Sequence, residues 1–437
     1  MDPSPASISP RLDAASLAWR YRAVRAATER LAEPLSPEDC AAQSMPDASP
    51  VKWHLAHTSW FFETFVLEAA VPGHRPFDPA FRALFNSYYN AVGEPHARAR
   101  RGLLTRPGLD EVRAYRAHVD RHLIAGLERG IARDLAAVVE LGLHHEQQHQ
   151  ELILTDVKHL LSQSPLRPAY RSELAPPARP QAPPPLGWCR FEAGIRCIGA
   201  PEQPSPPAGP GFHFDNEAPR HRVWLEAFEL ASRPATNREF LAFLADGGYA
   251  RPELWLAEGW DAVRALGWVA PGYWERRGGP WLEFTLGGLR PLDPDAPVSH
   301  LSYYEADAFA RWAGARLATE AEWEVAAADA ALDGNFVESG HLHPAAAPSG
   351  RAGREAPAQL FGDVWEWTAS PYTAYPGYRA AAGALGEYNG KFMCSQIVLR
   401  GGSCLTPAGH VRASYRNFFP AAARWQMSGV RLARDAS

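Results

Sequence analysis

Three histidines, three glutamines and two glutamates lie within the ten residues "GLHHEQQHQE", 142–151. His145 and His149 are four residues apart, so both imidazoles leave the same face of an α-helix. Two imidazoles at this spacing can chelate one divalent metal ion. His144 is about 100° around the helix from His145. We therefore expect His144 at the surface or behind the ligands, not on the metal.

A third nitrogen ligand is available in the earlier segment "SPVKWHLAHTSWFFETF". Trp53, His57, Trp60 and Phe61 recur there at i, i+4, i+7 and i+8, which is one apolar stripe of a helix. A histidine on such a stripe faces the interior of a helix bundle. A lone histidine in such a position is more often a hydrogen-bonded core residue. The histidine pair on a neighbouring helix instead favours the interpretation of His57 as a metal ligand. His54 lies off the centre of the stripe, and we expect it at the surface or behind the ligands.

The motif "HEQQH" also matches HExxH, in which the glutamate is the general base of a zinc protease. The segment that follows, "QELILTDVKHLL", lacks the third ligand of one such pattern. We instead expect Glu146 and Glu151 to accept hydrogen bonds from the ligand imidazoles. Three imidazoles suit iron(II) and zinc equally well, so ligand type leaves the metal open.

These side chains need helices to position them, and the first third of the chain predicts four. Helical apolar spacing extends over 16–32, over a segment beginning at Ser49 and Pro50, over 108–129 and over about 131–162. Ser49 is a candidate N-cap and Pro50 a candidate first helical residue. Four helices of this kind predict an up-and-down bundle over 16–164, whose interior can hold a metal.

The composition changes after the bundle. Residues 165–186 are too rich in proline for a helix or a central strand, and we predict a linker or a wrapping segment. Residues 187–434 combine short strand patterns, turns and brief helices without a regular repeat. The fold class predicted for the whole chain is α+β, a helical bundle followed by a mixed domain.

Bulk properties exclude several partners. The 437-residue chain has a net charge of −5, which gives no basic field for nucleic acid or anionic lipid. No apolar run is as long as a membrane span, and the N-terminus has no signal-peptide core. The five cysteines are dispersed, with no CxxC pair, which predicts a reducing cytoplasm and no disulfide framework. The oligomeric state stays open.

Several stretches resemble a known family: "SPVKWHLAHTSWFFETF", "LFNSYYNAVG", "LGLHHEQQHQELILTD" and "SYRNFFPAAARWQMSGVRLAR". They are similar to the EgtB-type sulfoxide synthases of ergothioneine biosynthesis, over about residues 16–434. The resemblance implies a DinB-like bundle and a domain like formylglycine-generating enzymes with a C-type-lectin-like core. It also implies the cofactor Fe(II) and the small-molecule substrates hercynine, a thiol and O₂.

The resemblance also assigns residues. It implies the same iron ligands that the spacing selects: His57, His145 and His149. Gln148 matches a glutamine that hydrogen-bonds the imidazole of hercynine. Asn417 and Phe418 match an Asn–aromatic pair that contacts the trimethylammonium group, where a ring face attracts a cation. Without the resemblance, this pair would be a turn in the core of the second domain.

The segment "NSYYN" contains Tyr88 and Tyr89. The resemblance implies that one of them is the proton donor, and we do not choose between them. In a strand their side chains would point to opposite faces.

Arg98 and Arg101 follow the tyrosines, and two guanidiniums can clamp a carboxylate. A solvated basic loop is the alternative. The branch using γ-glutamylcysteine has aspartate after the Asn–aromatic pair. Here Phe419 stands there and cannot pair with an ammonium, so we predict L-cysteine as the donor.

Other activities compete with this prediction. A zinc hydrolase or a DinB-type thiol transferase would use the same histidines. A formylglycine-generating oxidase needs a cysteine pair near the C-terminus, whereas Cys404 has no second cysteine in the following segment. A lectin-like binding module has no need of the HxxxH helix. A related synthase that uses histidine, γ-glutamylcysteine or a selenium donor is a further alternative.

Overall fold

The computed structural model describes residues 14–71, 73–174, 177, 182–201, 211–348 and 356–436. They fold as two compact units. The first unit comprises the described residues of Met1–His149, Glu202–Phe214 and Ala381–Tyr388, and the second comprises those of Gln150–Pro201, Asp215–Ala380 and Asn389–Ser437. The first is helical and the second is mixed, so the predicted α+β class is confirmed.

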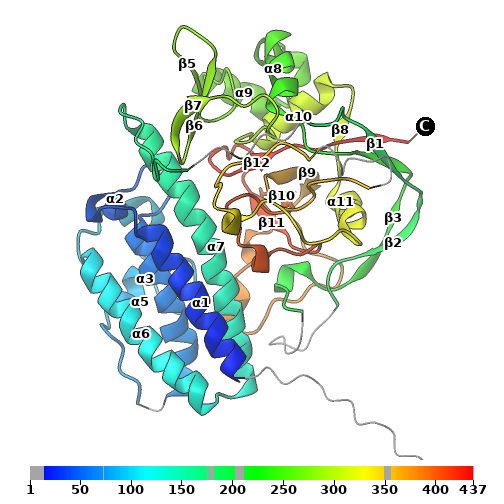
Figure 1. Ribbon diagram of the computed structural model, residues 1–437. Helices are drawn as coiled ribbons and strands as arrows, with labels where there is room; N and C mark the ends of the chain where they lie inside the picture. The colour runs from blue at the N-terminus through cyan, green and yellow to red at the C-terminus, as the bar shows by residue number, and fades with distance from the viewer. Residues whose placement is uncertain are drawn as a thin grey trace, which may run out of the picture. The chain divides into compact units, whose positions relative to one another are not determined.

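Long helices dominate the first unit, and they are the four that the sequence predicts (Figure 1). They are α1 (Ala14–Ala32), α3 (Val51–Phe62), α6 (Leu109–Arg129) and α7 (Arg133–Gln163), of which α7 gives residues to both units. Shorter helical elements join them: α2 (Pro37–Ala41), the π-helix η1 (Glu63–Leu67), α4 (Glu68–Ala70), α5 (Phe81–Leu84) and the 3₁₀ helix η2 (Arg98–Leu103). Every residue of α3 is buried, as expected for a helix that is apolar around most of its circumference.

The start of α3 differs from the prediction by one residue. Pro50 is the N-cap and Val51 the first helical residue, and no side chain caps the helix. The hydroxyl of Ser49 instead accepts a hydrogen bond of 2.9 Å from Nη1 of Arg101. A tertiary contact has therefore replaced the local cap that the sequence favoured.

The second unit contains two four-stranded sheets. The first has the order β1 (Trp188–Phe191), β4 (Phe228–Ala231), β13 (Leu432–Asp435), β8 (Arg316–Leu317). The second has the order β11 (Asn417–Phe419), β10 (Ile397–Arg400), β9 (Trp365–Pro371), β12 (Ser428–Gly429), in which only the β9–β12 pair is parallel. A two-stranded antiparallel sheet contains β2 (Gly194–Ile198) and β3 (His221–Leu225), and a three-stranded sheet contains β5 (Trp274–Arg276), β6 (Trp281–Thr285) and β7 (Gly288–Pro291).

Most of the α-helices of the second unit begin at sequence-encoded caps. The helices are α8 (Asn237–Ala245), α9 (Ala257–Leu266), α10 (Tyr303–Trp312) and α11 (Glu320–Ala327). Three of them, α8, α10 and α11, start with a Ser/Thr-x-x-Glu capping box. In each box the hydroxyl and the carboxylate satisfy two backbone N–H groups that the first turn leaves without partners.

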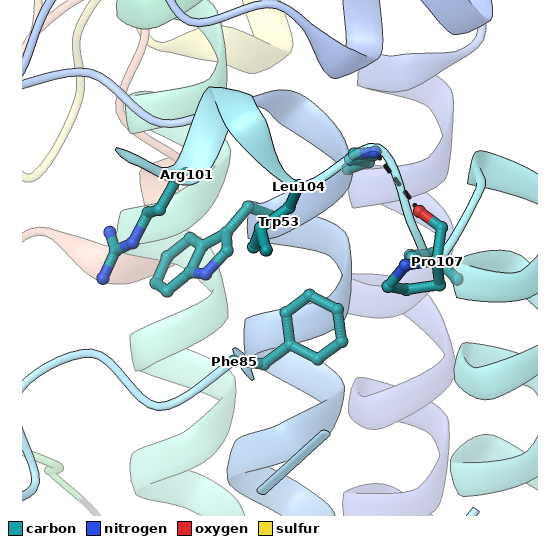
Figure 2. A pocket seen from close by; sticks show the side chains of 7 residues that line it. Trp53, Phe85, Arg101, Leu104 and Pro107 are labelled. Atoms are coloured by element: carbon teal, nitrogen blue, oxygen red, sulfur yellow. Dashed lines mark hydrogen bonds between the residues drawn. The ribbon is translucent and has the colours of Figure 1, made fainter. Parts of the chain in front are cut away.

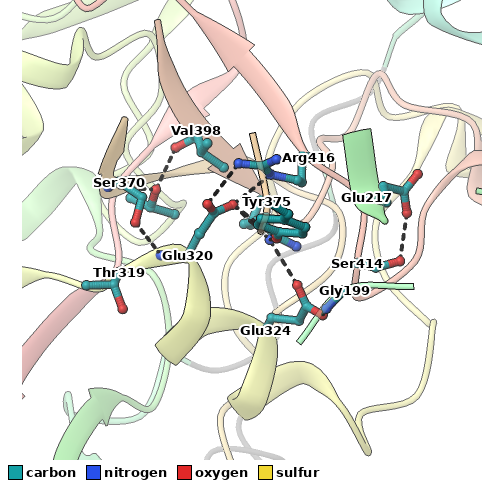
Figure 3. Close-up of polar contacts among 12 residues, drawn as sticks. Gly199, Glu217, Thr319, Glu320, Glu324, Ser370, Tyr375, Val398, Ser414 and Arg416 are labelled. Atoms are coloured by element: carbon teal, nitrogen blue, oxygen red, sulfur yellow. Dashed lines mark hydrogen bonds and ion pairs between the residues drawn. The ribbon is translucent and has the colours of Figure 1, made fainter. Parts of the chain in front are cut away.

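Buried ion pairs tie α11 to the second sheet (Figure 3). Nη2 of Arg400, in β10, lies 3.1 Å from Oε2 of Glu320 and 3.0 Å from Oε2 of Glu324. Arg416 donates to both oxygens of Glu320 at 2.9 Å. Loss of one partner in such a network leaves a buried charge uncompensated, at about 3–5 kcal/mol. The network therefore fixes the chain immediately before Asn417.

The proline-rich segment lies partly outside the described residues. Where it is described, it packs within the second unit: Tyr170 N donates to Leu286 O at 2.8 Å, and Arg167 lies 3.0 Å from Glu275. Within the described ranges, none of the helices combines the length and the apolar character that crossing a membrane requires.

Candidate metal centre

The three-histidine cluster comprises His57 of α3 and His145 and His149 of α7. All three side chains are buried, and each offers a ligand atom within 4.8 Å of the other two. Gly142 permits this proximity, because a Cβ there would lie 2.4 Å from the ring of Phe62 on α3. The absence of a side chain at Gly142 lets α7 approach α3 closely enough for the histidines to meet.

The ring orientation of His57 suits a metal. Its Nδ1–H donates a 2.6 Å hydrogen bond to the carbonyl of Phe85, which fixes the tautomer and leaves the Nε2 lone pair available. That Nε2 lies 3.2 Å from Nε2 of His145. Two nitrogens on one ion at ordinary bond lengths would be separated by about 3.0 Å at a right angle and about 3.4 Å at the tetrahedral angle. The observed separation therefore fits two ligands of one ion.

Electrostatics keep these imidazoles neutral. Burial lowers the pKa of His145 to about 3. Burial, followed by the neighbouring histidines, lowers the pKa values of His57 and His149 well below the ordinary value. The neutral form is the one that binds metal, so the cluster needs no deprotonation at neutral pH before it receives a cation.

Planar groups stack along α3 and hold the His57 ring. Trp53 and Trp60 stack on it with centroids 4.5 and 5.4 Å away, and the Arg101 guanidinium lies 3.3 Å from the Trp53 centroid. Figure 2 shows Trp53 and Arg101 beside a cavity that Phe85 also lines. The cavity measures about 10 Å³, which is room for about one water molecule and none for a substrate.

The tyrosine pair lies in a loop, not in a strand. The Asn86 carboxamide shapes this loop, accepting from Tyr89 N at 3.1 Å and donating to Tyr89 O at 3.0 Å. The rings of Tyr88 and Tyr89 therefore stack at 4.7 Å instead of pointing to opposite faces. Tyr89 is buried, with its ring centroid 5.5 Å from that of Trp60. Burial raises the pKa of Tyr89 well above the usual value, and Tyr88 raises it further.

Tyr388 is a site residue that the sequence did not reveal. Its hydroxyl donates to Oε1 of Gln148, 240 residues away in the chain, and its ring lies 5.6 Å from His145 and 6.3 Å from Tyr88. Glu387 secures this segment to the tyrosine loop by accepting from Asn90 N at 2.9 Å and from Ala91 N at 2.8 Å. No local pattern around "GEYNG" indicates this contact, because only long-range packing produces it.

The two excluded histidines are not at the surface. His54 is buried, and its Nδ1 lies 2.7 Å from Nδ1 of His149, so one ring donates to the other. His54 therefore supports a ligand from behind, which was one of the two expected locations. His144 is buried too, stacked on Phe212 at 4.0 Å and an interplanar angle of 10°. The helical-face argument correctly separates His144 from the cluster.

The expectation for the two glutamates was wrong. The Glu146 carboxylate receives Nη1 of Arg25 at 2.9 Å and Nη2 of Arg116 at 3.0 Å. Burial alone would raise its pKa, but the two arginines outweigh burial and lower it to about 2. Glu151 belongs to the second unit, where Trp365, Ser403 and Thr406 donate to it at 2.6–2.8 Å. Each carboxylate is held by its own donors instead of by a ligand imidazole.

The two arginines expected to form a clamp occupy different environments. Arg101 is buried, and besides Ser49 its guanidinium donates to Oγ of Ser87 at 3.2 Å, next to the tyrosine pair. Arg98 is exposed at the start of η2 and donates to the carbonyl of Asp47. Arg101 is thus built into the tyrosine loop, whereas Arg98 is held at the surface.

Asn417 and Phe418 lie in β11 of the second unit, paired with β10, and not in a turn. One face of the Phe418 ring stacks on Tyr372 at 3.9 Å and 9°. Asn417 Oδ1 accepts from Phe418 N at 2.9 Å. Phe419 is half-buried, with its ring centroid 6.1 Å from that of Trp425.

Comparison with known families separates the chain in the same way. Residues 20–153 match the DinB superfamily, and residues 190–358 and 356–436 match the sulfatase-modifying factor enzyme 1-like domain. His57, His145 and His149 fall in the first match and the sheets in the second.

Individual relatives extend over both regions. The chain is 32% identical to a hercynine oxygenase of Mycobacterium tuberculosis, over 96% of this chain and 98% of the relative. It is also 32% identical to one of Mycolicibacterium thermoresistibile, over 89% and 88%. A formylglycine-generating enzyme of Streptomyces coelicolor is 32% identical over 62% of this chain and 95% of its own. Among solved structures, PvdO from Pseudomonas aeruginosa covers 57% of this chain and 94% of its own at 18% identity, and its TM-score of 0.36 supports no inference.

Proposed function

This chain belongs to the hercynine oxygenase family, and from that premise we propose an iron(II)- and O₂-dependent sulfoxide synthase that joins L-cysteine to the imidazole of hercynine. The observation that carries the proposal is the three-histidine cluster, whose buried neutral nitrogens lie within 4.8 Å of one another. An oxygenase needs a group that activates O₂, and this cluster supplies ligands for a redox-active ion.

Iron(II) is the ion that we assign to His57, His145 and His149. These three residues would hold the ion, which would supply a lowered pKa for a bound thiol and a means of activating O₂. Zinc would satisfy the same nitrogens but has no redox chemistry. The donor set is therefore compatible with both ions, and the oxygenase family favours iron.

The proposed reaction balances with O₂ as the sole oxidant. The imidazole C–H and the thiol S–H bonds break, and a C–S bond and an S–O bond form. These changes remove four electrons from the organic substrates. O₂ accepts them, giving one oxygen atom to the sulfoxide and the other to water with the two protons. The enzyme must therefore deliver a proton during O₂ reduction.

Tyr88 and Tyr89 are the proposed sources of that proton. Burial keeps the Tyr89 phenol protonated at neutral pH, and a phenol can move its proton without leaving a strong base in a closed site. Tyr388 is a further candidate for the same role, because its ring centroid lies 6.3 Å from that of Tyr88 and 5.6 Å from that of His145. We include Tyr388 in the proton-donating group for that reason.

Recognition of hercynine is assigned to Gln148, Asn417 and Phe418. Since Oε1 of Gln148 accepts from Tyr388, the amide Nε2 of Gln148 is the group oriented to donate to an imidazole nitrogen. Asn417 and a ring face of Phe418 would contact the trimethylammonium group by cation–π attraction. Phe418→Leu should raise the KM for hercynine more than it lowers kcat.

The thiol donor is proposed to be L-cysteine, with Arg98 and Arg101 as its carboxylate-binding residues. Phe419 offers no carboxylate to the ammonium of a γ-glutamyl group, which would be left without a partner. A competition assay with equal cysteine and γ-glutamylcysteine tests this choice. A higher specificity constant for the dipeptide would refute it, and Arg101→Leu should raise the KM for cysteine far more than that for hercynine.

The reaction itself is tested after anaerobic purification. The full chain is loaded with iron(II) or with zinc and given hercynine, cysteine and O₂ or argon. Mass spectrometry should detect the sulfoxide only with iron and O₂. Turnover by the zinc form, or under argon, would favour a hydrolase or thiol transferase. The same assay with histidine or a selenium donor in place of a substrate separates the related synthases.

A further inference from the structure

A second group of metal-binding side chains lies in the first unit, away from the three-histidine cluster. The Glu63 cluster comprises Glu63 at the start of η1, His74 in the segment after α4, and His118 of α6. One ligand atom from each lies within 4.8 Å of the other two. His74 Nε2 and Glu63 Oε1 are 3.3 Å apart, and their side chains are only 4% and 6% exposed.

Outer contacts hold the Glu63 carboxylate in place. Oε1 accepts from Phe77 N at 3.1 Å, and Oε2 accepts from the Tyr115 hydroxyl at 2.7 Å. The π-helical turn that carries Glu63 differs from the regular α-helix before it, and single π-turns are frequent at functional sites. A carboxylate oriented by outer hydrogen bonds is typical of a metal ligand.

His118 supplies the observation that points to a ligand. Its Nε2 is buried and, among the residues that the structure describes, no side chain or backbone group bonds to it. A buried ring nitrogen without a hydrogen-bond partner costs free energy unless another group, such as a metal ion, binds it. Four residues on, His122 donates from Nδ1 to the His118 carbonyl at 2.8 Å, and its ring lies 4.3 Å from that of His118.

We propose that Glu63, His74 and His118 form a second metal site that binds zinc or a chemically similar divalent transition-metal ion. Two imidazole nitrogens and one carboxylate oxygen are a donor set of zinc enzymes, and a soft-to-borderline nitrogen pair disfavours magnesium and calcium. A cation would give His118 Nε2 a partner and would neutralise the buried carboxylate. Water completes the coordination.

This site is separate from the three-histidine cluster. Glu63 follows His57 by six residues, so it lies about 9 Å farther along the helix axis and about 240° around it. The two side chains therefore leave different faces of the same helix, and no residue serves both sites. The proposal does not depend on the reaction assigned to the three-histidine cluster.

The site also has a consequence for the chain between its ligands. His74 and Phe77, which both contact Glu63, precede α5, and Phe85 at the C-cap of α5 accepts the bond from His57. An ion at Glu63 would anchor the start of the segment whose end orients an iron ligand. The ion would thus stabilise the fold and restrain the conformation of segment 73–85.

The test uses the full chain with the first site emptied. In a His145→Ala/His149→Ala background, zinc binding is measured by equilibrium dialysis and cobalt(II) by its visible absorption, since tetrahedral cobalt gives intense d–d bands. The background should retain about one zinc ion per chain. Adding His118→Ala or His74→Ala should remove it, and adding His96→Ala, a histidine outside both clusters, should not.

A positioning variant distinguishes a built site from a chance group. Tyr115→Phe removes the hydroxyl that orients Glu63 and should weaken zinc binding by about 10- to 100-fold with unchanged helix content. His74 lies outside the helices, so His74→Ala tests the ligand role even if His118→Ala fails to fold. Absence of zinc and cobalt binding in the background would overturn the proposal and leave a Glu63–His74 ion pair.

Discussion

The helical unit contains two clusters that begin on the same stretch of helix but differ in charge. The three-histidine cluster offers three neutral nitrogens, and the carboxylate of Glu146, which follows His145 in the chain, is ion-paired to Arg25 and Arg116. The Glu63 cluster includes a carboxylate among its own donors. A divalent ion on neutral ligands keeps its full charge and attracts an anionic thiolate, whereas a carboxylate cancels part of that charge. An ion at the first cluster would therefore attract an anionic thiolate more strongly than an ion at the second.

Loss of a ligand should have the largest effect. His145→Ala or His149→Ala should abolish iron binding and turnover, a loss beyond the roughly 10–100-fold that follows removal of an outer partner. Iron content and product yield measure this, with circular dichroism to show that helix content is kept. His144→Ala should retain turnover, because its ring packs on Phe212. If His144→Ala lost iron and His145→Ala kept it, the helical-face argument would be wrong.

Removing the charge beside the first cluster should have the next largest effect, on stability. Glu146→Gln leaves Arg25 and Arg116 without their shared buried carboxylate and should cost about 3–5 kcal/mol of the free energy of unfolding. Urea denaturation of the metal-free protein measures it. Glu140→Gln on the same helix is the control, because its partner Arg20 is 34% exposed and the pair contributes about 1 kcal/mol or less. Equal losses in the two variants would contradict this account of Glu146.

Removing a phenol hydroxyl near the three-histidine cluster should change the product. Tyr88→Phe, Tyr89→Phe or Tyr388→Phe should leave thiol binding intact and lower sulfoxide formation by about 100-fold or more in the variant that loses the proton donor. From the family resemblance, flux should shift toward oxidation of cysteine to its sulfinic acid. Product analysis ranks the three tyrosines. Unchanged sulfoxide yield in all three would remove them from the mechanism, and Tyr115→Phe at the Glu63 cluster should not alter the product ratio.

The smallest effect should come from a substitution that separates α7 from α3. Gly142→Ala places a methyl group 2.4 Å from the Phe62 ring and should cost about 1–3 kcal/mol by overpacking. Iron affinity should fall with it, since α7 must move away from α3. Gly126→Ala in α6 is the control, because its Cβ meets only Ile131 at 3.8 Å and alanine favours a helix by about 1 kcal/mol. Wild-type stability in Gly142→Ala would show that the rings adjust freely.

The amino-acid sequence alone determined the helices and the three-histidine cluster. Periodicity of apolar residues and the four-residue spacing of His145 and His149 are local properties, set by 3.6 residues per turn. His57 followed from the same rule, since its stripe had to face the bundle interior. The capping boxes of the second unit are likewise written in four consecutive residues.

Only the tertiary structure decided which groups those residues meet. Glu146 pairs with arginines of α1 and α6, and Tyr388 reaches Gln148 across 240 residues. Hydrogen bonds with Asn86 hold Tyr88 and Tyr89 in a loop. The Glu63 cluster combines residues of η1, of the loop after α4 and of α6. Sequence spacing carries no information on such contacts, because they depend on which faces pack together and on the free energy of satisfying each buried polar group there.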